Sequence, residues 1–312
     1  VRRAYAEGFR SVVVNRRGHT PGRRLKAPRW NLFGDVEDFE QVYWYIKNEL
    51  AGPNTPLFLH GISSGTAVTV SSLAKWDKRR ATIMQQQQEQ QSQQKEENHT
   101  LDDSKFNLPN DKIAPTFVAS ISVTPGYDIS RVMVPQRFRF PYNDLLVHSV
   151  KEHFLLPNQN ILQSFHPQAF AAAMNASTLQ EFVDVTAPFA GYDTSQDYYQ
   201  HENPVVGMHY ITTPKLVLNA VDDPCCNIQN LYEQSPYIQH GGKTYDDIVR
   251  ASPNVLVAVT KTGSHCPFLD GQFFPFVRDP LFGNWMLHSW ADTVSIEYYK
   301  AALQVYGDRR FL

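Results

Sequence analysis

The sequence has little of the material from which disulfide-rich, metal-binding or membrane-spanning proteins are built. Its 312 residues include three cysteines, too few for a disulfide framework. No Cys-x-x-Cys or His-x-x-x-His spacing is present, so we expect no metal site. No apolar run is long enough for a transmembrane helix within this stretch. The net charge of −2 gives no sign of a nucleic-acid partner.

A Gly-x-Ser-x-Gly motif, from Gly61 to Gly65, is the most informative feature that the sequence does contain. It follows the apolar run 57–59 and precedes a helix-like stretch, which is the setting of a nucleophile elbow. Only small residues fit beside the serine in such a turn, and we expect both glycines to supply that room. The motif therefore predicts that Ser63 presents its hydroxyl to an open cleft. Alone it is a weak signal, because small residues also gather in ordinary turns.

An aspartate pair and a histidine follow Ser63, each just past the end of a predicted strand. Residues 214–220 form a short apolar strand in this prediction, and Asp222 and Asp223 come directly after it. Residues 254–260 form a second one, which ends shortly before His265. Because the carboxyl ends of parallel strands meet at one edge of a sheet, we expect these side chains to converge there. The chain order Ser, Asp, His is the order of the α/β-hydrolase fold.

These residue types suit acyl transfer. A histidine can take the proton of a serine hydroxyl near neutral pH, and a carboxylate can hold the imidazole in the required tautomer. We favour Asp223 as that carboxylate because it precedes Pro224, which pushes it toward an extended conformation; Asp222 is the reserve. The N–H of Ser64 is the expected oxyanion donor. Taken singly, each residue also fits an ordinary role in a turn, a helix cap or a loop.

Three further segments narrow the family. They are the stretch 8–19, the series that includes Leu179-Gln180-Glu181-Phe182, Gly191-Tyr192 and Asp197-Tyr198-Tyr199, and the segment 219–224. The stretch 8–19 looks like the strand and loop that precede the elbow in α/β-hydrolases. The other two resemble the YheT-like branch, the AB-hydrolase 4 family of esterases and lipases.

This resemblance implies a serine hydrolase that acts on acyl esters and needs no metal or organic cofactor. It carries the role of nucleophile onto Ser63, of acid onto Asp223 and of base onto His265. Two positions depart from the pattern. Ser64 stands where relatives often have an apolar residue, and Thr66 stands where they often have glycine.

The order of predicted elements divides the chain into five parts. They are a core with the elbow (1–76), a glutamine-rich insert (77–112), a core strand (113–128), a helical cap (129–210) and a core part with acid and base (211–312). The prediction is an α/β-hydrolase fold with helices flanking a mostly parallel sheet. We expect the insert, which has almost no apolar residues at 85–94, to be disordered or a frayed helix. Residues 285–304 are the predicted closing helix. Candidate pocket walls in the cap are Phe138, Phe140, Phe154, Phe165 and Phe170.

The start of the chain lacks expected elements. The first predicted strand, 11–15, resembles the fourth strand of the fold, so the first strands and the loop with the second oxyanion donor look absent. We therefore expect the chain as written to be poorly soluble and weakly active or inactive. Many eukaryotic relatives carry a membrane anchor in that region. The resemblance thus implies membrane association of the full-length protein, and a cytoplasmic location otherwise.

Six basic residues surround one loop, at positions 16, 17, 23, 24, 26 and 29. A solvated loop is the simpler interpretation, and contact with anionic lipid head groups at a membrane surface is the alternative.

Together these features predict a serine hydrolase that cleaves carboxylic esters through an acyl-serine intermediate. The expected substrates are acylglycerols, other lipids or short-to-medium-chain acyl esters. Two alternatives stay open, an alcohol acyltransferase with the same triad and a non-catalytic binding protein of this fold. Activity should fall as His265 is protonated, below about pH 6 to 6.5.

Overall fold

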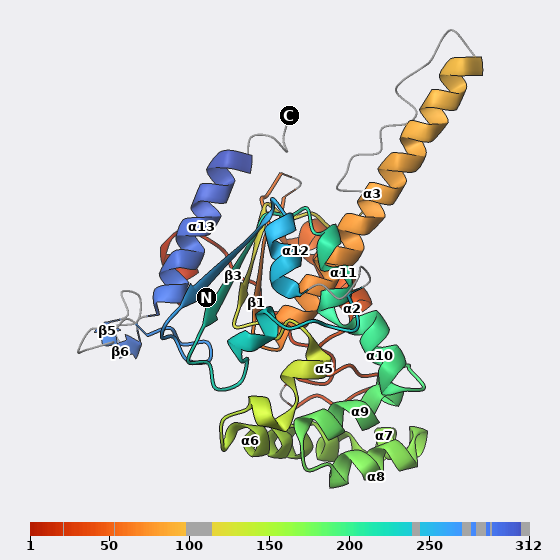
Figure 1. The fold of residues 1–312 in the computed structure, drawn as a ribbon, viewed down its shortest axis with the longest axis vertical. Helices are drawn as coiled ribbons and strands as arrows, with labels where there is room; N and C mark the ends of the chain where they lie inside the picture. Colours follow the sequence, from red (N-terminus) through yellow and green to blue (C-terminus); the bar gives the residue numbers. More distant parts are fainter. Residues whose placement is uncertain are drawn as a thin grey trace.

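A parallel four-stranded sheet forms the centre of the molecule (Figure 1). The computed structural model describes residues 1–20, 22–52, 54–97, 114–238, 244–269, 276–278, 285–287 and 289–306. The strands are β1 (Phe58–Ile62), β2 (Ala119–Val123), β3 (Lys215–Ala220) and β4 (Val255–Thr260), and they lie side by side in that order. Their apolar runs were all recognisable in the sequence.

Helices cover both faces of this sheet (Figure 1). One face packs against α2 (Val36–Tyr45), α3 (Gly65–Glu97) and α12 (Tyr245–Ala251). The other packs against α13 (Trp290–Tyr306), which contacts the short α1 (Arg2–Ala6). Every residue of β2 and β3 is buried, because helices exclude water from both sides of these parallel strands. The predicted fold class, a parallel sheet flanked by helices, is confirmed.

The register of the strands brings their carboxyl ends to one edge of the sheet. Ile62 at the end of β1 pairs with Val123 at the end of β2, and Ala220 at the end of β3 pairs with Thr260 at the end of β4. The segments that follow β1, β3 and β4 therefore leave the sheet together, and these are the segments that carry the predicted site residues.

Between β2 and β3 the described chain forms helices and turns, which we call the cap (residues 129–210). Its helices are α5 (Ile129–Val132), α6 (Tyr142–Val150), α7 (Gln159–Phe165), α8 (Pro167–Asn175), α9 (Leu179–Ala190), α10 (Ser195–Glu202) and α11 (Pro204–Gly207). Helices α6 to α9 gather beyond one end of the sheet (Figure 1).

Tyrosines from the segment that marked the family resemblance tie the cap together. The hydroxyl of Tyr199 on α10 donates to Asp184 on α9, and the hydroxyl of Tyr198 donates to Asn31 in the core. Helix α9 begins with a capping box between Thr178 and Glu181. The Leu-x-Glu-Phe and Tyr-Tyr motifs therefore hold the cap in place rather than touching Ser63.

Helix α3 differs from the prediction for the glutamine-rich insert. It continues as helix through residues 85–94 to Glu97 and projects away from the body of the protein (Figure 1). Of the two alternatives for this part, disorder was therefore wrong. Gln, Glu, Lys and Arg are good helix formers. The start of α3 is already docked on the core, so the helix can extend without the cost of nucleating a new one. Residues 98–112 of the predicted insert lie outside the described residues.

The predicted boundary at residue 77 also moves. Asp77 is buried, and its carboxylate accepts the backbone N–H groups of Thr212 and Thr213 just before β3. It is also paired with Arg80, which reaches the carbonyl oxygens of Ala114 and Pro115. The core part of α3 therefore extends at least to residue 80, because these polar contacts join the helix to the start of two strands.

Two other predicted elements differ from the structure. Residues 11–15 form no strand, and Val12 and Val13 are exposed. In the described sheet β1 pairs only with β2, so this segment does not pair with the open edge of β1. The predicted closing helix at 285–304 begins at Trp290; residues 285–287 form strand β6, which pairs with β5 (Phe276–Arg278). None of the described helices combines the length and the apolar character that crossing a bilayer requires.

Candidate active site

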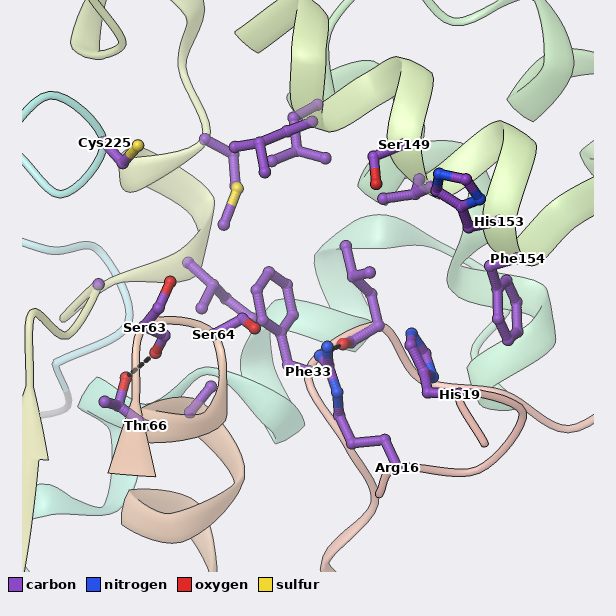
Figure 2. Close-up of a pocket in the computed structure, with 18 of the residues that line it drawn as sticks. Arg16, His19, Phe33, Ser63, Ser64, Thr66, Ser149, His153, Phe154 and Cys225 are labelled. Carbon is purple, nitrogen blue, oxygen red and sulfur yellow. Dashed lines mark hydrogen bonds between the residues drawn. The ribbon is translucent and has the colours of Figure 1, made fainter. Parts of the chain in front are cut away.

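Ser63 occupies a sharp turn between β1 and α3. Its φ of 51° lies in the left-handed region, which is uncommon for a residue with a side chain. The turn is held by hydrogen bonds from the Ser63 N–H to Val123 O (2.9 Å) and from the Thr66 hydroxyl to Ser63 O (2.6 Å; Figure 2). Thr66, a departure from the family pattern, thus locks the turn with a side-chain hydroxyl that glycine would lack.

The two glycines of the motif contribute differently. A Cβ atom on Gly61 would lie 2.5 Å from Thr69 Oγ1 and 2.9 Å from Thr66 Cα, so this position requires glycine. A Cβ atom on Gly65 would meet nothing within 4 Å. The expectation that both glycines make room for the turn is therefore wrong for Gly65.

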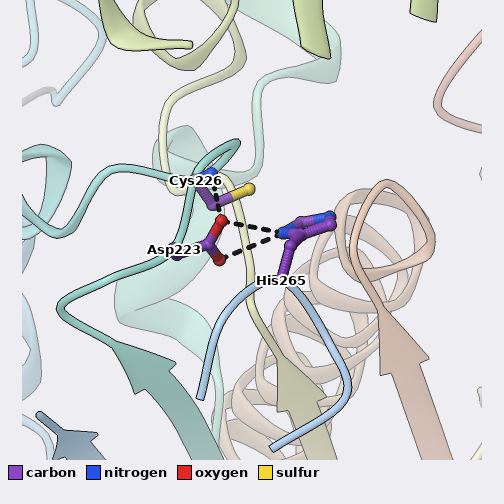
Figure 3. A group of neighbouring side chains, drawn as sticks. All are labelled: Asp223, Cys226 and His265. Carbon is purple, nitrogen blue, oxygen red and sulfur yellow. Dashed lines mark hydrogen bonds and ion pairs between the residues drawn. The ribbon is translucent and has the colours of Figure 1, made fainter. Parts of the chain in front are cut away.

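His265 connects Ser63 to a carboxylate. It lies in the loop after β4, and its Nε2 is 2.7 Å from Ser63 Oγ. Its Nδ1 is 3.0 Å from each carboxylate oxygen of Asp223 (Figure 3). Because a carboxylate can only accept, Nδ1 carries the hydrogen, which leaves Nε2 of the neutral ring to accept from the Ser63 hydroxyl. The three side chains thus form one chain of hydrogen bonds.

The two aspartates after β3 have separate partners. Asp223 is buried, and its Oδ1 also accepts the backbone N–H groups of Cys225 and Cys226, each at 2.8 Å. The reserve candidate, Asp222, accepts the backbone N–H of Ser264 at 2.8 Å and so steadies the loop that carries His265. The geometry therefore selects Asp223 as the partner of the imidazole.

The pKa of His265 departs from its ordinary value. Burial lowers the pKa of the imidazole, but the hydrogen bond to Asp223, with a further contribution from Cys266, outweighs burial and raises the pKa to about 9. The acid limb expected at about pH 6 to 6.5 assumed an unperturbed imidazole. The buried carboxylate moves that limb to higher pH, because more alkaline conditions are needed to free Nε2.

Ser64 lies beside Ser63 in the wall of the same pocket, directly before α3 begins at Gly65. Its backbone N–H is therefore at the positive end of a helix, where a developing negative charge is favoured. The role of this N–H as oxyanion donor stays a prediction.

A pocket of about 860 Å³ opens at Ser63 and His265 and runs between the core and the cap. Of the five phenylalanines proposed as pocket walls, Phe138 and Phe154 line it. Phe170 is instead buried among the cap helices, while Phe140 and Phe165 are 89% and 54% exposed. Other apolar residues of the wall are Leu32, Phe33, Ala67, Ile129, Val132, Met133, Leu146, Val150, Leu179 and Pro267.

Part of the wall was not foreseen as pocket. Arg16, Arg23 and Arg24, from the loop whose simpler interpretation was solvated chain, line the pocket together with His19 and His153. Arg23 and Arg24 are exposed, as that interpretation expects, while Arg16 is partly buried where the cap folds against the loop. No local signal in the sequence marks His153, which reaches the pocket only through the packing of the cap.

Three potential metal ligands meet at the same place. Ligand atoms of Asp223, Cys226 and His265 lie within 4.8 Å of one another (Figure 3). The carboxylate and imidazole already bind each other, and burial raises the pKa of the Cys226 thiol well above its ordinary value. A protonated thiol is a poor metal ligand, so this set suits a hydrogen-bonded dyad better than a cation.

The sequence relatives of the chain include proteins named as a lipase and a phospholipase. Mouse monoacylglycerol lipase ABHD2 is 24% identical over 314 residues, which cover 96% of this chain and 60% of that protein. Mouse phospholipase ABHD3 is 25% identical over 265 residues, with 85% and 52% covered. The chain thus spans about three fifths of the length of the curated relatives that it matches first. No family model matches it.

Solved structures with some likeness to the chain include two esterases. A thermophilic esterase from Thermogutta terrifontis has a TM-score of 0.40 and 11% identity, with 85% of this chain and 77% of that chain covered. An esterase from Exiguobacterium antarcticum has a TM-score of 0.39 and 13% identity, with 98% and 85% covered. The sequence relatives, the parallel sheet and the elbow together identify the chain as an α/β-hydrolase by fold.

Proposed function

We propose that this chain is the hydrolase part of a lipid esterase of the YheT-like, AB-hydrolase 4 branch, which cleaves carboxylic esters through an acyl-Ser63 intermediate. One observation carries the proposal. A continuous chain of hydrogen bonds runs from Ser63 Oγ through His265 to the buried Asp223, at the carboxyl edge of a parallel sheet. That constellation activates a serine for acyl transfer on several unrelated folds.

The reaction proceeds in two halves. Ser63 Oγ attacks the ester carbonyl and passes its proton to Nε2 of His265, while Asp223 stabilises the imidazolium. The N–H of Ser64 stabilises the oxyanion. His265 then gives its proton to the departing alkoxide, which leaves an acyl-serine. A water molecule, deprotonated by His265, attacks that ester and releases the acid, and Ser63 regains its proton.

The proposed substrate is a lipid ester. Apolar side chains from α5, α6 and the segment 32–33 line one part of the pocket, which suits an acyl chain. The names of the relatives, a monoacylglycerol lipase and a phospholipase, support the same class of substrate.

A fluorophosphonate probe tests the nucleophile. We expect the probe to label the protein, Ser63→Ala to abolish labelling, and Ser149→Ala to leave it unchanged. Ser149 is the matched control because it is a serine that lines the same pocket but forms no described hydrogen bond with His265 or Asp223. Labelling that persists in Ser63→Ala would overturn the proposal.

Product analysis tests the acyl acceptor. In mixtures of water and ethanol, we expect free fatty acid to dominate over ethyl ester. Predominant ethyl ester would favour the acyltransferase alternative. A folded protein that neither reacts with the probe nor cleaves an ester would favour the non-catalytic alternative.

A further inference from the structure

The pocket has a basic end that the proposed reaction does not use. Arg16, Arg23, Arg24, His19 and His153 all line it, and no acidic side chain does so among the described residues. Figure 2 shows the labelled members of this group on the side of the pocket away from Ser63, with the Phe33 ring between them. Residues far apart in the chain thus place nitrogen donors around one end of a cavity.

The basic loop contacts the cap at its two ends, while Arg23 and Arg24 between them are exposed. A Cβ atom on Gly18 would lie 2.5 Å from the Phe154 ring, so loop and cap touch at this glycine. The His19 ring stacks on the Phe154 ring at 4.8 Å. At the other end of the loop, Leu25 is buried, and its N–H donates to Asn158 of the cap at 2.8 Å. These contacts hold the loop against the pocket from both sides.

Five of the six basic residues of the cluster fall into two sets. Outside the pocket, Arg17 is paired with Asp38, and Arg29 is paired with Asp35 and Glu37. The three pocket arginines have no carboxylate partner within the described part of the chain. Arg16 is partly buried, and its guanidinium donates to the carbonyl oxygen of Leu32. One N–H group is thereby used to hold the side chain in place, and the Arg16 charge has no described carboxylate partner. Arg23 and Arg24 are exposed, so water solvates their charges.

We propose that this basic end binds a phosphate monoester on the head group of the ester whose carbonyl is attacked by Ser63. The inference rests on the proposed function and narrows its substrate class to anionic lysolipids. A neutral glycerol would leave the partly buried guanidinium of Arg16 without a counter-charge, and the arginines would repel a choline ammonium. A phosphate monoester presents three oxygens to donors that arrive from different directions, whereas a carboxylate presents two oxygens in one plane.

The rest of the pocket agrees with this orientation. The apolar wall from α5 and α6 accommodates the acyl chain, while the head group extends past Phe33 toward Arg16. A lysolipid with a compact phosphate head thus directs its two ends to two chemically distinct parts of one cavity.

A comparison of three substrates tests the proposal. The substrates are hexanoyl lysophosphatidate, hexanoyl lysophosphatidylcholine and monohexanoylglycerol, all below their micelle-forming concentrations. We expect the wild-type protein to have its highest kcat/KM for the lysophosphatidate. In the Arg23→Gln/Arg24→Gln double variant, that value should fall about tenfold or more, since each lost contact is charge-assisted. The values for the other two substrates should change less than about twofold.

A matched variant separates the pocket from its surroundings. Lys26 is exposed like Arg23 and Arg24 and belongs to the same loop, but it does not line the pocket. We expect Lys26→Gln to leave all three kcat/KM values unchanged. Equal losses in Lys26→Gln and in the arginine variant, with parallel losses of binding to vesicles that contain phosphatidylserine, would assign the cluster to a membrane surface and overturn the proposal.

Binding to Ser63→Ala separates failure of this inference from failure of the proposed function. Calorimetry with hexanoyl lysophosphatidate should give binding that weakens in Ser63→Ala/Arg16→Gln, whether or not any ester is cleaved. Inorganic phosphate should bind more weakly than the lysolipid, because it lacks the acyl chain. Equal affinity for free phosphate and lysophosphatidate would identify a phosphate site unrelated to the ester. Equal affinity for lysophosphatidate and monohexanoylglycerol would exclude recognition of the anion.

Discussion

The two ends of strand β3 hold buried charge in different ways. At its carboxyl end, Asp223 is surrounded by donors, namely the Nδ1–H of His265 and two backbone N–H groups. At its amino end, Lys215 is 1% exposed, and its Nζ donates to the hydroxyl of Ser122 at 2.7 Å. A charged acceptor thus lies at one end of β3, and a neutral acceptor receives the lysine at the other.

This difference decides the direction of each pKa shift. Burial lowers the pKa of Lys215 to about 7, because a hydroxyl does not compensate an ammonium. Burial also lowers the pKa of His265, but the carboxylate of Asp223 reverses the sign and raises it to about 9. The comparison teaches that burial alone weakens a base, as at Lys215, and that a paired carboxylate reverses this effect and strengthens the base, as at His265.

Removing the carboxylate of Asp223 should have the largest effect, because it makes the carboxyl end of β3 resemble the amino end, where the buried base has no described charged partner. In Asp223→Asn, we expect kcat/KM for an ester to fall by about 10⁴-fold, because the imidazole loses its tautomer and its counter-charge. The pKa of His265 should also fall from about 9, since only the smaller contribution of Cys266 then opposes burial. A pH profile of kcat/KM measures both effects.

The neighbouring aspartate provides the control for that experiment. Asp222→Asn keeps an oxygen that can accept the N–H of Ser264, so its effect should be far smaller. Equal losses in the two variants would mean that the buried carboxylate has no special role.

Replacing the lysine tests the other end of β3. The pKa of Lys215 is lowered in the folded state, so the unfolded state binds more protons between about pH 7 and 10, and the stability of the wild type gains from rising pH. In Lys215→Met this gain disappears. The free energy of unfolding of the variant minus that of the wild type should therefore decrease by about 1.4 kcal/mol per pH unit between about pH 8 and 10.

Urea unfolding at several pH values measures this difference. Lys261→Met is the control, because Lys261 is an exposed lysine on the segment after β4. A pH-independent difference for Lys215→Met would show that the buried amine stays charged throughout.

A pair of glycine variants asks whether the carboxyl edge depends on close packing as well as on charge. Gly61→Ala places a methyl group against Thr69 and the backbone of Thr66, so we expect Ser63 to shift and kcat/KM to fall about 10²-fold. Gly65→Ala meets open space and should change kcat/KM by less than about threefold. Equal effects would contradict the contacts described at this turn.

The smallest effect is expected from removing the hydroxyl of Ser122, which accepts from Lys215 at the amino end of β3. Ser122→Ala removes the described hydrogen-bond acceptor of Lys215, which should destabilise the protein by about 1 to 3 kcal/mol. The loss should be greater at pH 6 than at pH 9, because the ammonium needs the acceptor more than the neutral amine does. Thermal unfolding of the wild type and Ser122→Ala at pH 6 and pH 9 would show at which pH the loss of stability is greater.

The parts of this molecule that could be predicted are those in which local pattern and tertiary structure agree. Short apolar runs marked β1 to β4, and the residue order at their carboxyl ends indicated where the hydrogen-bonded residues would meet. Asp223 was preferable to Asp222 because Pro224 biases the residue before it. The structure pairs Asp223 with His265 accordingly.

The parts that could not be predicted depend on distant neighbours. The valines at 12–14 favour a strand locally, yet a strand exists only where another backbone can bond to it. The glutamine run has no core to join, but helix propensity and the docked start of α3 are enough to extend the helix. The basic end of the pocket needs His153 of the cap to fold against a loop more than a hundred residues earlier in the chain.

Helix α3 offers an attachment point that lies far from the pocket. It starts beside Ser63 and, at about 1.5 Å per residue, carries exposed positions such as Gln88 some 35 Å along its axis. A single cysteine introduced there could anchor the protein to a bead or an electrode while the mouth of the pocket stays clear, which would let turnover be followed on one immobilised molecule.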